Sequence, residues 1–411
     1  MKNAGICLIM AFIVAFFACK EYPERNKASM KTRNNLYFHD RELLENHIEI
    51  LELKKGESAL IIVPAWQGRV MTSTCEGDNG LSFGWINHEL ISSGNKLKHM
   101  NPYGGEERLW LGPEGGQYAL FFKTGDPFEY EYWQTPPVMD TESFEPEGRT
   151  DTKALFSKKG KLTNYSGTVF DFRITRIIHL LDPGEIEALA NAGLTDVQAV
   201  AYKSDNIIEN TGTNSWTKDK GLPSIWMLGM FKPSPSAVVL IPVIEGKIDE
   251  YGPVVNDNYF GSIPGDRLKI KDNIIYFKAD GKERGKIGIP PMRSKGIMGS
   301  YDPENKALTL LLTDIPDQGS VFVNSAWKFQ DEPYSGDALN SYNDGPLDDG
   351  SVMGPFYELE TSSPALSLRP GEKYKHSQTT IHLRGQEEQL DAICEKVFGI
   401  SLENIKTIFQ Y

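Results

Sequence analysis

The sequence predicts an all-β protein, and three observations support this fold class. From residue 48 onward, short runs rich in β-branched and aromatic residues recur between clusters of Gly, Pro, Asn and Asp. Several runs alternate, and Phe170, Phe172 and Ile174 can face one core while the polar residues between them face water. Long helical patterns are scarce, and no repeat of fixed period favours a propeller or solenoid. Antiparallel sheets are therefore expected.

The individual elements follow from these patterns in chain order. A short helix is predicted at 41–49, and a second at 183–192, where Pro183 stands at the start. A C-terminal helix at 386–397 places Leu390, Ile393, Cys394 and Val397 at helical spacing. The predicted strands are 48–53, 59–63, 118–122, 168–178, 197–208, 237–244, 268–277, 307–312 and 320–324.

The first residues predict export. Lys2 is a short basic region, and residues 4–18 form an apolar run shorter than the about 20 residues of a membrane-spanning helix. The run ends at Ala18-Cys19, which resembles a lipoprotein signal. We therefore predict a signal peptide at 1–18, a spacer at 19–36 lipidated on Cys19, and one domain at 37–411. The protein would be anchored by its lipid to a bacterial membrane, in the periplasm or at the cell surface, with plain secretion and a retained anchor as alternatives.

Composition and charge narrow the class of partner. The chain has 411 residues, of which 40% are hydrophobic and 24% charged, as in folded globular proteins. Its formal charge of −13 repels nucleic acids and anionic membrane surfaces, so a neutral or cationic partner is favoured. The four cysteines form no disulfide framework. The sequence does not fix an oligomeric state.

Common catalytic and cofactor motifs are absent from the sequence. There is no Walker loop, G-x-S-x-G, H-E-x-x-H or Rossmann glycine run. His376 and His382 would share a strand face about 20 Å apart, which is too far to chelate one ion. We therefore predict no cofactor and no metal.

Residues 101–116 combine glycines, carboxylates, an arginine and aromatic residues. Trp110 could cover the C–H face of a sugar, while Arg108 and Glu107 bind its hydroxyls. The alternative is a glycine-rich connection in which Trp110 anchors the core and Arg108 pairs with Glu106 or Glu107.

A second polar cluster lies between residues 340 and 364. Glu358 and Glu360 share one face of a predicted strand, so their mutual repulsion would raise the pKa of one of them into a useful range. Tyr342, Asn343 and Asp344 precede them in an Asp-rich segment, where a solvated turn is favoured over a Ca²⁺ site. The alternative for the two glutamates is a solvated strand face.

In their order along the chain, these motifs resemble a known family. They are Gly-Gly-x-x-Arg108-x-Trp110, Asn210 followed by Trp216, and Glu358-x-Glu360-x-Ser-x-Pro. Over residues 45–385 the chain resembles the galactose mutarotase-like, or aldose 1-epimerase-like, superfamily. It is most similar to a branch of that superfamily found in bacterial lipoproteins.

The resemblance implies a β-supersandwich with a short C-terminal helix and a sugar-sized cleft on a concave sheet. It also implies that Glu360 is the catalytic base and Arg108 a sugar-binding residue. The histidine acid of the family should fall between His179 and His376, where this chain has none. His376, His382 or Tyr342 would then replace it. The predicted site comprises the catalytic residues Glu360 and His376 and the substrate-binding residues Arg108, Trp110, Glu107, Tyr342, Asn343, Asp344, Glu358 and His382.

The sequence leaves three functions open. The first is an exported protein that binds or modifies carbohydrate, with an isomerase activity like that of aldose 1-epimerases. The second is a non-catalytic glycan-binding module, favoured by the missing histidine. The third is a polysaccharide lyase or hydrolase, for which a basic patch at Lys153, Lys158, Lys159 and Lys161 is the only support.

Overall fold

A computed structural model describes residues 35–315, 317–347 and 349–410 of the chain. The predicted signal peptide, Cys19 and nearly all of the predicted spacer lie outside the described residues. Within the described part, none of the helices combines the length and apolar character that crossing a membrane requires.

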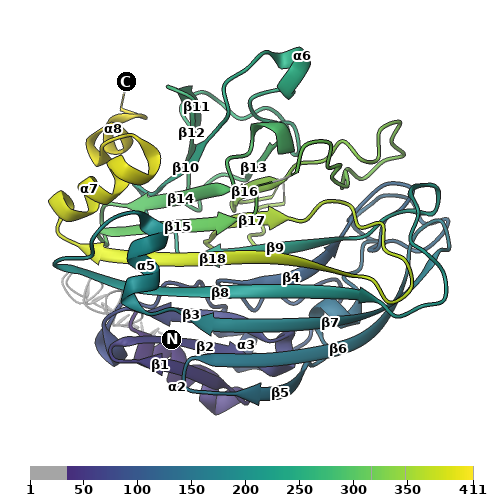
Figure 1. The fold of residues 1–411 in the computed structure, drawn as a ribbon, viewed down its shortest axis with the longest axis horizontal. Helices are drawn as coiled ribbons and strands as arrows, with labels where there is room; N and C mark the ends of the chain where they lie inside the picture. Colours follow the sequence, from purple (N-terminus) through teal and green to yellow (C-terminus); the bar gives the residue numbers. More distant parts are fainter. Residues whose placement is uncertain (1–34, 316, 348, 411) are drawn as a thin grey trace, which may run out of the picture.

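Three antiparallel sheets dominate the described residues (Figure 1). The smallest contains β1 (Leu51–Lys55), β2 (Ser58–Val63) and β3 (Arg69–Thr74). The five-stranded sheet has the order β13 (Gly285–Ile289), β16 (Leu339–Asn343), β17 (Tyr357–Ser362), β9 (Ser224–Phe231) and β4 (Arg108–Gly112). The ten-stranded sheet has the order β11 (Leu268–Lys271), β12 (Ile274–Lys278), β10 (Val238–Pro242), β14 (Ile297–Asp302), β15 (Ala307–Thr313), β18 (Lys373–Gly385), β8 (Val197–Asn210), β7 (Val169–Leu180), β6 (Lys153–Thr163) and β5 (Glu145–Arg149).

The helices are short and lie outside the sheets. They are α2 (Tyr37–His47), α3 (His88–Ser93), α4 (Pro137–Asp140), α5 (Pro183–Ala190), α6 (Ile248–Tyr251), α7 (Glu387–Phe398) and α8 (Leu402–Thr407), with 3₁₀ turns at Pro64–Trp66, Gly77–Asn79, Lys218–Lys220 and Pro291–Arg293. The start of α5 is fixed by Pro183 and by a capping box between Asp182 and Glu185. The three predicted helices are confirmed within a few residues, whereas α3, α4, α6 and α8 were not predicted.

Alternation along the strands separates the two faces of each sheet. In β7 every second residue is buried, as the pattern around Phe170, Phe172 and Ile174 predicts. One face of the ten-stranded sheet packs against the five-stranded sheet, through a cluster that includes Val239, Leu311 and Leu359. Helices α5, α7 and α8 pack on its opposite face (Figure 1). The predicted all-β class with large sheets and a C-terminal helix is confirmed.

Strand β5 forms one edge of the ten-stranded sheet. All five of its residues are exposed, and three of them are charged. A bulge between Pro146 and Gly148 interrupts its pairing with β6. The ladder therefore ends in a short, irregular strand.

Three strand predictions were wrong in detail. The apolar run at 118–122 is a buried loop, in which Ala119 and Leu120 donate to the carbonyls of Gly116 and Pro113 in turn-like hydrogen bonds. The run at 320–324 forms one isolated bridge through Phe322. The run at 268–277 is a hairpin rather than one strand, because Asp272 and Asn273 adopt the positive φ angles of a two-residue turn.

Candidate functional site

One face of the five-stranded sheet carries a cluster of charged and aromatic side chains. Tyr357 and Thr361 point toward the ten-stranded sheet, where they bond Ser300 and His376, so the alternating Glu358 and Glu360 point the other way. We call the face that carries these two glutamates the carboxylate face. The register of the strands places further side chains on it: Arg108, Trp110, Trp226, Leu228, Met230, Lys286, Asn340 and Tyr342.

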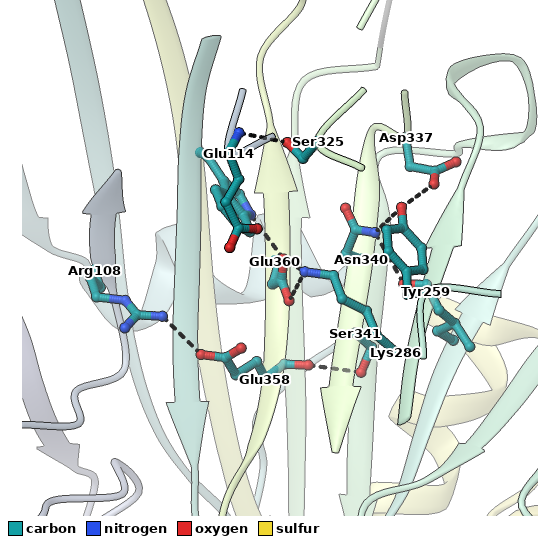
Figure 2. Close-up of polar contacts among 12 residues, drawn as sticks. Arg108, Glu114, Tyr259, Lys286, Ser325, Asp337, Asn340, Ser341, Glu358 and Glu360 are labelled. Atoms are coloured by element: carbon teal, nitrogen blue, oxygen red, sulfur yellow. Dashed lines mark hydrogen bonds and ion pairs between the residues drawn. The ribbon is translucent and has the colours of Figure 1, made fainter. Parts of the chain in front are cut away.

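Each central glutamate is paired with a cation from another strand (Figure 2). The Arg108 Nη2 atom on β4 donates to Glu358 Oε1 at 3.0 Å. The Lys286 ammonium on β13 contacts both oxygens of Glu360, at 3.0 and 2.9 Å. The two cations thus approach from the two edge strands and neutralise carboxylates on the central strand.

The two glutamates differ in their surroundings. Glu360 is fully buried and also accepts a hydrogen bond from Trp226 Nε1 at 2.8 Å, so three contacts hold its carboxylate. Burial raises the pKa of Glu358 to about 7, because the Arg108 guanidinium only partly offsets the loss of solvation and the nearby Glu360 opposes ionisation. Burial also lowers the pKa of Arg108, an effect that Glu358 opposes. Glu358 is therefore a carboxyl whose proton exchanges near neutral pH.

Tryptophan rings surround the two ion pairs. The Arg108 guanidinium lies 4.1 Å from the centroid of Trp110, and Lys286 Nζ lies 4.9 Å from that of Trp226. Trp110 and Trp226 contact each other edge to face at 5.6 Å. The carboxylate face thus combines charged groups with two buried indole rings.

A third carboxyl and a tyrosine lie at the border of this face (Figure 2). Burial raises the pKa of Glu114, and the Lys286 ammonium opposes that shift. The Tyr259 hydroxyl donates to Asp337 at 2.5 Å and accepts from Asn340 Nδ2 at 3.0 Å. Burial raises the pKa of Asp337 to about 6.

The structure brings six of the predicted site residues together and separates the other four. Arg108, Trp110, Glu358, Glu360 and Tyr342 share the carboxylate face. Asp344 lies beside them and accepts from the Tyr342 hydroxyl at 2.7 Å. Asn343 instead binds the 280–283 turn through Gly281 and Glu283.

Glu107, His376 and His382 lie between the sheets, away from the carboxylate face. Glu107 pairs with Arg176 of β7, and His376 bonds Thr361 on the opposite face of β17 from Glu360. His382 stacks on Phe83 and bonds Glu106 and Thr309. Burial lowers the pKa of His376 to about 4, so it is neutral at pH 7. No contact of the described residues joins either histidine to Glu358 or Glu360.

Six residues of this face and its border are not marked as site residues by any pattern in the sequence: Glu114, Trp226, Tyr259, Lys286, Asp337 and Asn340. Lys286 and Trp226 come from strands far from Glu360 in the sequence, and only the pairing of β13, β16, β17 and β9 brings them together. The sequence of β9 is apolar throughout after Ser224, so no alternation along it marks Trp226 as a site residue. Among the described residues, no group of three or more His, Cys, Asp or Glu side chains is arranged to hold a metal ion.

The raised pKa of Glu358 predicts a dependence of stability on pH. Because the folded state holds this proton more tightly than the unfolded state, unfolding should become easier as pH rises from about 4.5 to about 7. The contribution is on the order of 3 kcal/mol of unfolding free energy. Chemical denaturation of the wild type and of Glu358→Gln at several pH values measures it.

The decisive quantity is the difference in the pH dependence of the unfolding free energy between the wild type and Glu358→Gln. The Glu358→Gln variant should lack this component of the pH dependence, whereas Glu395→Gln, an exposed change on α7, should retain it. Identical pH profiles for the wild type and Glu358→Gln would show that Glu358 does not bind its proton more tightly in the folded state.

Comparisons with known proteins bear on the family and the fold. Residues 35–409 match the model of a family of unknown function, DUF6786. No curated protein sequence matches the chain. The fold is similar to that of the Slr1438 protein from Synechocystis sp. PCC 6803, at 12% identity, 82% coverage of this chain, 96% of that chain and a TM-score of 0.49. It is also similar to a galactose mutarotase-like protein from Lactobacillus casei ATCC 334, at 12% identity, coverages of 81% and 100%, and a TM-score of 0.47. A galactose mutarotase related enzyme from Lactobacillus acidophilus is similar at 10% identity, with 81% of this chain and 97% of that chain covered and a TM-score of 0.45.

Proposed function

The chain belongs to the DUF6786 family, and we propose that it binds carbohydrate on the carboxylate face. One observation carries the proposal: Arg108, Lys286, Glu358 and Glu360 converge on one sheet face between two tryptophans. Sugars present both hydroxyls and apolar C–H surfaces. Charged side chains bind the hydroxyls and indole rings cover the C–H surfaces, so this combination of groups fits a sugar.

The charges of the face favour a neutral sugar. Arg108 and Lys286 are already paired with Glu358 and Glu360, and Glu114 adds a further carboxyl. A uronic acid or a sulfated sugar would bring another negative charge to a centre where Arg108 and Lys286 are already paired with carboxylates. Neutral hydroxyls can instead share the donors of Arg108 and Lys286 with the two glutamates.

For catalysis we assign the base to Glu358 rather than to Glu360. The pKa of Glu358 is raised to about 7, and its Oε2 atom makes no hydrogen bond to the described residues. The oxygens of the Glu360 carboxylate are instead engaged by Lys286 and Trp226. In an aldose 1-epimerase-like reaction, Glu358 would take the proton of the anomeric hydroxyl while Lys286 protonates the ring oxygen, which opens the ring. Reversal of both transfers on either face of the carbonyl would give the two anomers.

A non-catalytic glycan-binding module is the second candidate. The position of both His376 and His382 between the sheets favours it, because no described contact brings a histidine to either glutamate of the carboxylate face. Saturable sugar binding without any change in anomer ratio would distinguish this candidate from the epimerase.

We also propose that the protein is exported and lipid-anchored through Cys19. The apolar run at 4–18 and the cysteine that follows it support this proposal. Metabolic labelling with a fatty acid analogue, compared with Cys19→Ala, would test it.

Sugar binding should depend on the planar fork of Arg108. Arg108→Lys keeps the positive charge but loses the stacking on Trp110 and the Nη2 donor geometry. We expect affinity for an aldose to fall about 10- to 100-fold, as for loss of a hydrogen bond from a charged group. Isothermal titration with galactose, glucose, mannose and xylose measures the effect, alongside polarimetry of freshly dissolved sugars.

The matched control is Arg173→Lys on β7, which lies on the other large sheet at the outer surface. This variant should bind as the wild type does. The proposal fails if no sugar or oligosaccharide binds, or if Arg108→Lys binds a sugar as tightly as the wild type.

A further inference from the structure

Aromatic rings continue from the carboxylate face to the solvent on the β4 side. Trp226, which bonds Glu360, contacts Trp110, and Trp110 contacts Trp133 with centroids 6.3 Å apart. Trp133 stacks with Tyr130 at 6.1 Å and an interplanar angle of 18°. The side chain of Trp133 is buried, whereas Tyr130 is 63% exposed. This series of rings therefore ends at an open aromatic surface.

A second series leaves the carboxylate face on the β16 and β13 side. Tyr342 pairs in register with Glu358, and its ring lies 6.1 Å from that of Phe260. Phe260 is 49% exposed. The guanidinium carbon of Arg284 lies 3.7 Å from the Phe260 centroid, which adds hydrogen-bond donors beside an exposed ring.

The distance covered by these rings exceeds one sugar. The carboxylate face spans five strands, and four interstrand intervals of about 4.8 Å give about 19 Å across the sheet. A single sugar ring placed on Glu358 and Glu360 would leave both outer aromatic surfaces uncovered. Tyr130 and Phe260 both leave ring surface open to solvent, and Phe260 also has the Arg284 guanidinium over its ring, so each can pack against the C–H face of a further sugar unit.

We propose that the ligand is an oligosaccharide of neutral sugars, with Tyr130 and Phe260 as outer stacking platforms on opposite sides of the central glutamates. This inference rests on the proposed function and specifies the length of its ligand. The central ion pairs bind one sugar unit, and the two series of rings bind its neighbours. A chain ligand explains why aromatic surface is exposed on both sides of the same polar cluster.

The test measures affinity as a function of chain length. Isothermal titration would use glucose, galactose, mannose and xylose with their homologous oligosaccharides up to six units. Wild-type affinity should rise with length for one series. Tyr130→Ala and Phe260→Ala should each lower the affinity for the longest member about tenfold relative to the monosaccharide, a loss comparable to that of an aromatic contact.

Phe38→Ala is the matched control, because Phe38 is also an exposed phenylalanine with an arginine over its ring. It should leave the length dependence unchanged. Equal affinities for one and six units, or a length dependence that survives in the Tyr130→Ala/Phe260→Ala double variant, would overturn the inference while leaving the proposed function intact. Failure of the whole panel to bind would overturn both.

Discussion

Replacing Arg176 with methionine is expected to lower the free energy of unfolding at neutral pH by about 3–5 kcal/mol, the cost of an unpaired buried charge. Arg176 and Glu107 are both fully buried between the sheets and form an ion pair. Ser204 and Gln378 also donate to Glu107, at 2.9 and 3.1 Å, but neither supplies a charge. Without Arg176 the Glu107 carboxylate must either stay charged and unpaired in an apolar interior or take up a proton. Urea denaturation measures the change.

Two further variants distinguish the two possible causes of this destabilisation, the loss of the ion pair and the loss of packing. Arg173→Met lies on the same strand at the outer surface and should change stability by less than about 1 kcal/mol. Arg176→Met combined with Glu107→Gln removes both charges and should recover most of the loss. A double variant no more stable than Arg176→Met would show that packing, not the unpaired carboxylate, causes the instability.

Glu358→Gln is expected to lower turnover of the accepted sugar by about 10²- to 10⁴-fold, the usual contribution of a general base. The amide keeps the size of the side chain but accepts no proton. Glu360→Gln is the matched change on the same strand and should cost less in rate, because Glu360 holds Lys286 and takes no proton in the assigned mechanism. Polarimetry of both variants and the wild type measures the rates.

The pH profile adds an independent readout. The wild-type kcat/KM should rise with pH around an apparent pKa near 7, since the base must be ionised. That rise should disappear in Glu358→Gln. Full activity in Glu358→Gln, with loss confined to Glu360→Gln, would return the base to Glu360.

The sequence could predict those features of the site that depend on local periodicity. Alternation along one strand is enough to place Glu358 and Glu360 on one face, and likewise Arg108 and Trp110. Glu107 and Arg108 are adjacent, so the same alternation points their side chains to opposite faces of the sheet. One binds Arg176 in the interior and the other binds Glu358.

The sequence could not predict the features of the site that depend on pairing between strands distant in the chain. Lys286 and Trp226 reach Glu360 only because β13 and β9 join the same sheet as β17. His376 follows Glu360 by sixteen positions, yet β18 belongs to the other large sheet, so the two side chains lie on opposite faces of β17. No local pattern specifies which sheet a strand will enter.

The edge formed by β5 bears on how the protein avoids aggregation. A ten-stranded antiparallel sheet presents backbone donors and acceptors at its borders, where a strand of another molecule could add. Glu145, Glu147 and Arg149 place charges along this border, while Pro146 lacks an N–H donor and begins the bulge that bends the strand. If the β5 edge of a second copy paired with this one, the charged side chains of both edges would have to lose water. The bulge would also prevent a regular ladder of hydrogen bonds. This edge of the large sheet is thereby protected from growing beyond its own chain.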